Sequence, residues 1–351
     1  MITLDFPPEH GGIQKYLYNI VKHTFEVNDT VAVGYSRKHD FHDPDIKCKV
    51  SFFSTLPSII NKKFSLIPLT LFLLRTIKKN PSNTVIECGN IYAAIAPFAL
   101  SFILNVNYDV FCYGKELLIF RKKTLKSRFL RLVLNRAQKL YYISTYTKDL
   151  ISKIVPKANM CYFPPKIEIP CFSNNTPPKK SSDILHLLSV GRLVAHKGHK
   201  YLIQAVNDLP KTFKWELTIA GSGPCEKSLK RLVKKLNLDN NILIKTSLDN
   251  NELTHEYQKA DIFVFPSFES RSGTEGFGVV LLEAMAYKLP IIASRTGGVT
   301  DVAGNGQYGL CVKPQCPEEI TDAILKLANN PQLCKVLTSN AHSNLIKNYV
   351  W

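Results

Sequence analysis

The sequence lacks the features that mark several protein classes. Its nine cysteines include no Cys-x-x-Cys pair, which argues against a zinc site, and their odd number fits reduced thiols better than a disulfide framework. The N-terminus shows no basic segment followed by an apolar run, so no signal peptide is predicted. The two longest apolar stretches, 56–74 and 85–104, contain charges such as Lys62 and Glu87 that are costly in hydrocarbon. We therefore expect a globular, cytoplasmic protein.

Acidic side chains are also scarce. There are 28 Asp and Glu against 45 Lys and Arg, which gives a net charge of +17. Residues 1–170 carry 24 basic and 12 acidic side chains, and residues 171–351 carry 21 and 16. A basic half indicates an anionic partner, which can be a nucleic acid, an acidic lipid surface or a phosphorylated substrate. Composition alone does not choose among them.

The 351 residues alternate strand-like and helix-like segments, most clearly in the second half. Strands are predicted there at 184–190, 215–220, 242–246, 262–266 and 290–294, with helices at 198–209, 225–236, 251–259 and 277–287. Strand candidates in the first half are 31–35, 85–88, 108–112 and 140–143. Repeated units of this kind predict an α/β protein with parallel, doubly wound sheets covered by helices on both faces.

The length and the proline pattern predict two domains. Prolines and polar residues are concentrated between the two halves, a composition that suits a connector. We predict an N-terminal domain at 1–165, a linker at 166–183 and a C-terminal domain at 184–351. Ligands bind such sheets at the carboxyl ends of the strands, so we expect a ligand-binding cleft between the domains.

The strongest chemical signal is the segment 274–284, which reads TEGFGVVLLEA. Gly276 and Gly278 would let backbone amides at a helix start approach an anion closely. Glu275 stands at the mouth of a strand–loop–helix unit, and Glu283 follows eight positions later, one turn into the helix. There Glu283 can face the same side as Glu275 and accept hydrogen bonds from ribose hydroxyls. The alternative is that Glu275 caps the helix and Glu283 is merely solvated. An isolated charge in an otherwise apolar helix favours the binding role.

A second signal is the segment 191–198, GRLVAHKG, which follows a predicted strand. Arg192 and Lys197 flank a helix N-terminus, which places two cations where a diphosphate can bind. Basic loop residues are usually just solvated, so this signal is modest alone and becomes much stronger together with Glu275 and Glu283. His196 and His199 lie beside Lys197, but no third ligand is evident and no metal site is predicted.

The third signal is a pair of glycines, Gly11 and Gly12, in the segment 7–13. They lie where a short apolar strand turns into a helix, which suits a loop that approaches a phosphate or a sugar. A plain tight turn would use the same residues, so this signal is weak alone.

Together the motifs resemble the retaining glycosyltransferases of family 4, which have the GT-B fold of two Rossmann-like domains. The resemblance extends from FPPEHGG at 6–12 through SVGRL at 189–193 to GG at 297–298, and the Glu-x7-Glu segment with GFG is its most specific part. It implies transfer of a hexose-type sugar from a nucleotide-sugar, such as a GDP- or UDP-sugar, with retention at the anomeric carbon and without a metal or other cofactor. The acceptor hydroxyl would attack from the front side, assisted by the leaving phosphate.

The resemblance also implies that the domain at 1–165 binds the acceptor and that the domain at 184–351 binds the nucleotide-sugar donor. It further implies roles for single residues. Arg192 and Lys197 would clamp the donor diphosphate and stabilise the leaving group, and Glu275 would contact the hydroxyls of the transferred sugar. The further donor-binding residues it implies are Gly11, Gly12, Gly191, Phe277, Gly278, Val279 and Glu283. His10 and Tyr113 would contact the acceptor or the sugar, although family members often have histidine where this chain has Tyr113. The long terminal cross-over helix of the family is not recognised in the sequence.

The segment 121–139, RKKTLKSRFLRLVLNRAQK, combines basic residues with an apolar stripe. Leu125, Phe129, Leu132 and Val133 recur at helical spacing. Such a helix either binds an anionic membrane surface or a lipid-phosphate acceptor, or packs its apolar stripe on the sheet as an ordinary surface helix. No nucleic-acid recognition module is visible, so no nucleic-acid partner is predicted.

Three functions remain open from the sequence. The leading one is a glycosyltransferase with a lipid-linked or cell-envelope glycan acceptor at the inner face of the cytoplasmic membrane. The second is a nucleotide-sugar epimerase or a phosphorylase with the same fold. The third is a truncated, inactive homologue that binds sugars or membranes.

Overall fold

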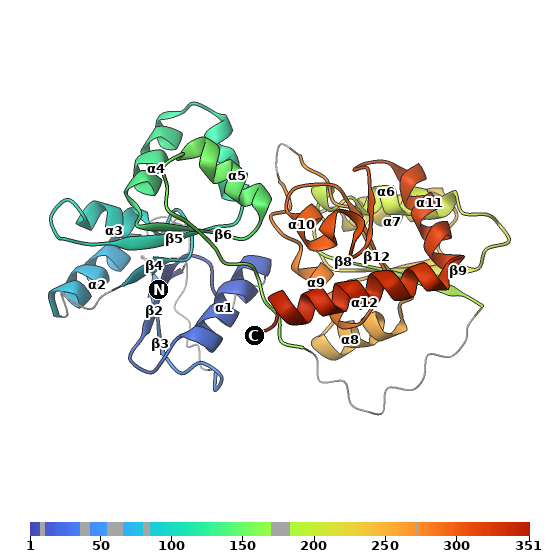
Figure 1. Ribbon diagram of the computed structural model, residues 1–351, viewed down its shortest axis with the longest axis horizontal. Coiled ribbons are helices and arrows are strands. Elements are labelled where there is room, and N and C mark those ends of the chain that lie inside the picture. The colour runs from blue at the N-terminus through green and yellow to red at the C-terminus, as the bar shows by residue number, and fades with distance from the viewer. Residues whose placement is uncertain (8–10, 36–42, 55–65, 80–84, 170–182, 271–272) are drawn as a thin grey trace. The chain divides into compact units, whose positions relative to one another are not determined.

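The computed structural model describes residues 1–7, 11–35, 43–54, 66–79, 85–169, 183–270 and 273–351 (Figure 1). The chain divides into two compact units, Met1–Pro165 and Lys166–Trp351. Each unit is a parallel sheet with helices packed against it.

The sheet of the first unit has the strand order β3-β2-β1-β4-β5-β6-β7, and every neighbouring pair is parallel. Its strands are β1 (Ile2–Thr3), β2 (Thr30–Tyr35), β3 (Lys49–Ser54), β4 (Ile86–Cys88), β5 (Tyr108–Cys112), β6 (Lys139–Tyr142) and β7 (Met160–Tyr162). All five residues of β5 are buried. A central parallel strand covered on both faces requires such a continuous buried run.

The helices of the first unit are α1 (Gly12–Thr24), α2 (Leu66–Lys79), α3 (Ile95–Leu100), α4 (Leu125–Arg136), α5 (Thr145–Ile154) and the 3-10 helix η2 (Lys115–Arg121). Residues of α2, α3, α4 and α5 share one apolar core with the sheet. A capping box between Thr124 and Ser127 fixes the start of α4, because each side chain satisfies the other's backbone N–H.

The second unit has the strand order β10-β9-β8-β11-β12-β13, again with all pairs parallel. Its strands are β8 (Leu185–Val190), β9 (Trp215–Ala220), β10 (Ile242–Lys245), β11 (Ile262–Phe265), β12 (Ile291–Ser294) and β13 (Leu310–Val312). Its helices are α6 (His199–Asn207), α7 (Glu226–Lys235), α8 (Asn250–Lys259), α9 (Val279–Ala286), α10 (Val299–Ala303), α11 (Pro317–Ala328) and α12 (Pro331–Asn348), with 3-10 turns η3 (Ala195–Lys197) and η4 (Gly304–Gly306).

Helices cover both faces of the second sheet. In Figure 1, α6, α7 and α11 lie on one side of the strands and α8, α9 and α12 on the other. The last helix, α12, packs on α9, and beyond it Val350 pairs with Ile167 in a parallel bridge. The predicted α/β class with two doubly wound parallel sheets is therefore confirmed. Strands β3, β7 and β13 are additions that the sequence patterns did not single out.

Candidate functional site

The topology of the second sheet directs attention to the ends of β8 and β11. Strands β9 and β10 lie on one side of β8, while β11, β12 and β13 lie on the other, so the strand order reverses between β8 and β11. At such a switch point the two following loops diverge and leave room for a ligand outside the carboxyl edge. The predicted residues Lys197 and Glu275 come from the loops after these two strands.

The structure brings Lys197 and Glu275 together. The Lys197 Nζ atom lies 2.5 Å from Glu275 Oε2, and both side chains are largely buried. The same ammonium group stands 4.6 Å from the centre of the Phe265 ring, at the last residue of β11. A paired, partly desolvated cation at the mouth of the sheet is preorganised to meet an anion, because it needs no large rearrangement to do so.

Two glycines allow these loops to come close. Gly198 has a φ of +73°, and a Cβ there would overlap the carbonyl oxygen of Pro266 after β11. Gly297 has a φ of +51° and faces the carbonyl oxygen of Glu275, which accepts a hydrogen bond from the Gly298 N–H at 3.0 Å. The loop after β12 thus holds the backbone of Glu275. Sequence reasoning quoted Gly297 and Gly298 as part of a resemblance but missed this role.

The start of α9 lies between the two predicted glutamates. Gly278 is the N-cap with a φ of +93°, and the helix begins at Val279. Glu275 therefore lies in the loop before the helix. Glu283 lies in the second turn of α9, partly exposed, and its Oε2 accepts a hydrogen bond from the Tyr257 hydroxyl at 2.9 Å.

The other predicted donor residues surround the same loops. Arg192 is exposed, directly after Gly191 at the end of β8. Phe277 is buried with its ring against Tyr349, so its backbone rather than its ring is available at the loop. Val279 is the first residue of α9, whose leading N–H groups carry a partial positive charge.

His199 lies in the core next to the loop that carries Lys197. Its ring is buried, with Nδ1 placed 3.3 Å from Ser189 Oγ on β8. Burial, with a smaller effect of the nearby Lys197 charge, lowers the pKa of His199 to about 4. The ring is therefore neutral at pH 7 and adds no charge beside Lys197.

The predicted residues of the first unit lie after β1 and β5. Gly11 is the N-cap of α1 and Gly12 its first residue, whereas His10 lies outside the described residues. Tyr113 is buried, and its hydroxyl donates a hydrogen bond of 2.6 Å to the carbonyl oxygen of Gly89. This contact fixes Tyr113 between the loops after β4 and β5.

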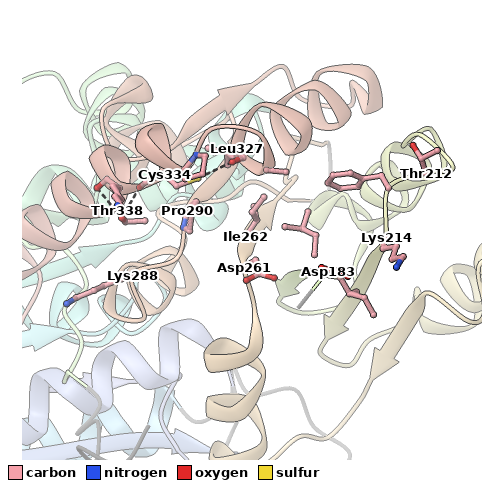
Figure 2. A pocket seen from close by; sticks show the side chains of 16 residues that line it. Asp183, Thr212, Lys214, Asp261, Ile262, Lys288, Pro290, Leu327, Cys334 and Thr338 are labelled. Atoms are coloured by element: carbon pink, nitrogen blue, oxygen red, sulfur yellow. Dashed lines mark hydrogen bonds between the residues drawn. The ribbon is translucent and has the colours of Figure 1, made fainter. Parts of the chain in front are cut away.

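A cavity of about 730 Å³ opens at the opposite, amino edge of the second sheet (Figure 2). Its lining includes Lys214 before β9, Asp261 and Ile262 at the start of β11, and Pro290 before β12. None of the predicted site residues lines it. Because open parallel sheets bind ligands at the carboxyl edge, the loops around Lys197 define the candidate site and this cavity does not.

The described residues lack two further features. No group of three or more His, Cys, Asp or Glu among them is arranged to hold a metal ion. Across the same part of the chain, no helix combines the length and the apolar composition needed to cross a membrane.

Comparison with known proteins extends this picture. The chain is 24% identical to the GDP-mannose-dependent alpha-(1-6)-phosphatidylinositol monomannoside mannosyltransferase of Mycolicibacterium smegmatis, over 100% of this chain and 94% of that protein. Sucrose-phosphate synthase from Thermosynechococcus elongatus has a similar structure, with a TM-score of 0.80 at 18% identity, over 100% of this chain and 94% of that one. The Anabaena protein HepE in complex with UDP-glucose gives a TM-score of 0.78 at 18% identity, over 99% and 95%.

The two Rossmann-like units have the GT-B fold. Residues 174–344, just under half of the chain, match the family model described as glycosyl transferases group 1, and this match supports a glycosyltransferase.

Proposed function

We propose that the protein is a retaining glycosyltransferase that moves a hexose-type sugar from a nucleotide-sugar, such as a GDP- or UDP-sugar, to a lipid-linked or cell-envelope glycan. The observation that carries this proposal is the ion pair between Lys197 and Glu275 at the switch point of the second sheet. Relatives of similar architecture support the donor class: one is GDP-mannose-dependent and another was solved with UDP-glucose.

The pair suits both halves of a nucleotide-sugar. A bound diphosphate would replace Glu275 as the partner of Lys197. Arg192 and the N-terminal amides of α9 would supply further positive charge, so no metal ion would be needed to compensate the charge of the diphosphate. The Glu275 carboxylate, released from Lys197, would accept hydrogen bonds from the sugar hydroxyls. As the leaving phosphate gains charge, Lys197 and Arg192 would stabilise it, which lowers the barrier to front-side attack by the acceptor.

The remaining assignments follow from their places around the loops. The backbone of Phe277, Gly278 and Val279 would hold sugar or phosphate, and Glu283 would hold the ribose. Gly191 would leave room beside the Lys197 stem. In the other unit, Gly11 and Gly12 form the start of α1, where backbone amides would bind a phosphate or a sugar.

The proposal is tested by transfer assays with a panel of GDP- and UDP-sugars, in which NMR reports the anomeric configuration of the product. Lys197→Ala and Glu275→Gln should each lower turnover by about 10²–10³-fold, the range seen when one preorganised transition-state contact is removed. Lys200→Ala is the matched control, because Lys200 is exposed and lies over Tyr201. Activity that survives EDTA would support metal independence.

Other outcomes would redirect the assignment. Unchanged turnover in both site variants would overturn the donor site. An isomerised nucleotide-sugar formed without acceptor would identify an epimerase, and donor binding without transfer would identify an inactive homologue.

We also propose that α4 binds the anionic surface of the cytoplasmic membrane. The helix packs on the first unit through Ser127, Leu130, Val133 and Leu134. A second set of apolar side chains forms the α4 patch, made of Phe102, Ile103, Leu125, Phe129 and Leu132. Exposure is 83% for Leu125 and 82% for Ile103.

The patch is continuous and surrounded by positive charge. Phe98 joins its two segments, with ring centroids 5.1 Å from Phe102 and 5.7 Å from Phe129. The exposed basic side chains of the same segment are Lys122, Lys123, Lys126, Arg128 and Arg131. Apolar side chains that enter the headgroup region, with cations worth about 1 kcal/mol each near an anionic leaflet, are the two contributions that hold an interfacial helix.

Co-sedimentation with vesicles tests this surface. Wild type should bind vesicles that contain phosphatidylglycerol and should bind pure phosphatidylcholine much more weakly. The double variant Leu125→Ser, Leu132→Ser should lose binding to the anionic vesicles. The control is Lys230→Gln, Lys234→Gln on α7, a basic helix whose apolar residues Leu229 and Val233 are buried. Equal sedimentation with both lipid compositions would refute the membrane role.

A further inference from the structure

Glu283 is held by a residue that no motif indicated. Tyr257 lies on α8, which precedes β11, and its hydroxyl donates a hydrogen bond of 2.9 Å to Glu283 Oε2 on α9. The two residues are 26 positions apart. Burial and the Glu283 charge raise the pKa of Tyr257 well above its usual value, so the phenol keeps its proton and remains a donor.

The Tyr257 ring is fixed on both sides. It stacks on Tyr287 with centroids 4.9 Å apart and planes within 3°, and on Phe263 of β11 at 5.8 Å and 24°. Only 2% of Tyr257 is exposed. A packed aromatic ring has few orientations, so its hydroxyl holds one position relative to the carboxylate.

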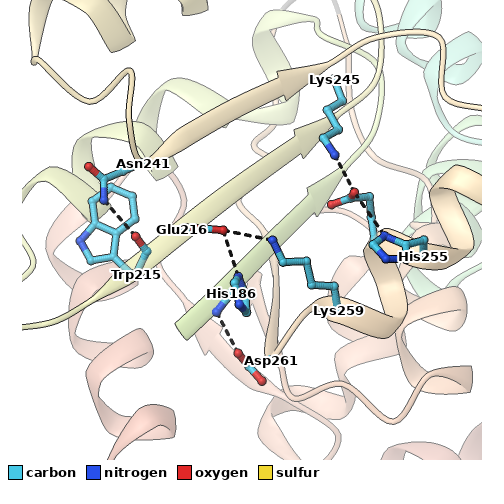
Figure 3. Close-up of polar contacts among 9 residues, drawn as sticks. His186, Trp215, Glu216, Asn241, Lys245, His255, Lys259 and Asp261 are labelled. Atoms are coloured by element: carbon cyan, nitrogen blue, oxygen red, sulfur yellow. Dashed lines mark hydrogen bonds and ion pairs between the residues drawn. The ribbon is translucent and has the colours of Figure 1, made fainter. Parts of the chain in front are cut away.

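The helix that carries Tyr257 is itself tied to the sheet on either side of this residue (Figure 3). Before it, Glu256 pairs with Lys245 at the end of β10, with Nζ and Oε1 2.7 Å apart. After it, Lys259 pairs with Glu216 on β9 at 3.1 Å. These contacts fix α8 against two strands and thereby fix the position of the Tyr257 hydroxyl.

We propose that Tyr257 is the positioning residue for the nucleoside ribose, which it aligns by orienting the Glu283 carboxylate. A carboxylate has two oxygens with about four acceptor sites, so it can accept from the tyrosine and still receive vicinal hydroxyls. Without the contact to Tyr257, the Glu283 side chain would have to be ordered when the ribose binds, at a cost in side-chain entropy. This inference rests on the proposed donor site. Tyr257 lies outside the motifs that carry the family resemblance.

The test compares nucleoside diphosphates that differ only in the ribose. Binding of GDP, UDP and their 2′,3′-dideoxy analogues to the full chain is measured by calorimetry. Wild type should prefer the ribose form of the base it accepts. Tyr257→Phe should weaken binding of that form about tenfold and change the dideoxy form less than twofold, because the lost contact acts through ribose hydroxyls. In transfer assays, Tyr257→Phe should raise the KM for the nucleotide-sugar much more than it lowers kcat.

The controls separate positioning from packing. Tyr257→Phe keeps the stacked ring, and a thermal melt checks that it is folded. Tyr287→Phe keeps the same stack and removes a hydroxyl that contacts Thr254 Oγ1 instead, so it should leave the ribose preference unchanged. If Tyr257→Phe weakens both ligand forms equally, or weakens neither, the positioning role is overturned while the donor site stands. If wild type binds no nucleoside diphosphate, the proposed function and this inference both fail.

Discussion

The buried imidazole of His199 predicts a specific loss of stability in acid. An unfolded histidine has a pKa of about 6.5, whereas burial in the folded chain lowers the pKa of His199 to about 4. As the pH falls below 6.5 the unfolded chain takes up this proton before the folded chain does. The neutral His199 therefore makes its full contribution to the free energy of unfolding above pH 6.5, and this contribution is lost as the pH falls toward 4.

The size of the effect follows from the two pKa values. The proton uptake destabilises the folded state by about 2 kcal/mol between pH 7 and pH 5, and by about 3 kcal/mol at pH 4. Protonation of the folded form would also place a second cation beside Lys197, which is the second cause of the lowered pKa. Acid should therefore disturb the loop that carries Lys197 together with the core beneath it.

Urea unfolding of wild type and His199→Asn at pH 7, 6 and 5 measures this contribution. Asparagine keeps an amide near the position of Nδ1, which faces Ser189, but it does not titrate. The variant loses packing at every pH, so the informative quantity is the slope of stability with pH. Buried carboxyl groups with raised pKa values, such as Glu87 and Glu116, act equally in both proteins and cancel. Parallel slopes for the two proteins would refute the reasoning.

Two further predictions concern backbone contacts. Gly297→Ala places a Cβ against the Glu275 carbonyl at a φ of +51°, so sugar transfer should fall at least about tenfold. Gly306→Ala, also at positive φ but with open space around it, should cost stability of about 1–2 kcal/mol and leave transfer near wild type; equal activities would contradict the contact argument. Tyr108→Phe removes the donor to the buried Val133 carbonyl and should lower the free energy of unfolding by about 1–3 kcal/mol, as urea titration would show.

The predicted loops were located well because strand ends are local signals. Apolar runs that stop at Gly191 and after Phe265 marked the carboxyl edge, and Lys197 and Glu275 stand just beyond them. Their ion pair joins residues 78 positions apart, and it exists because β8 and β11 are neighbours in the sheet. The helix predicted from residue 277 begins at Val279, because Gly278 at positive φ is its N-cap.

The α4 segment shows the limit of periodicity. The helix has two apolar stripes, one through Leu130 and Val133 and one through Leu125 and Leu132. Both repeat with the period of a helix, so the sequence left the ordinary surface helix and the membrane helix equally plausible. Packing against the first unit buries the former stripe and exposes the latter.

Local sequence patterns were sufficient to predict the α/β class, the parallel sheets and the loops that carry the charged site residues, because each depends on a few neighbouring residues. Tertiary structure decided which distant side chains meet: Lys197 with Glu275, Tyr257 with Glu283, and the Gly297 loop with the backbone of Glu275. These pairings are set by strand order and helix packing. A local pattern does not specify either, since the same strands and helices can be assembled in more than one order.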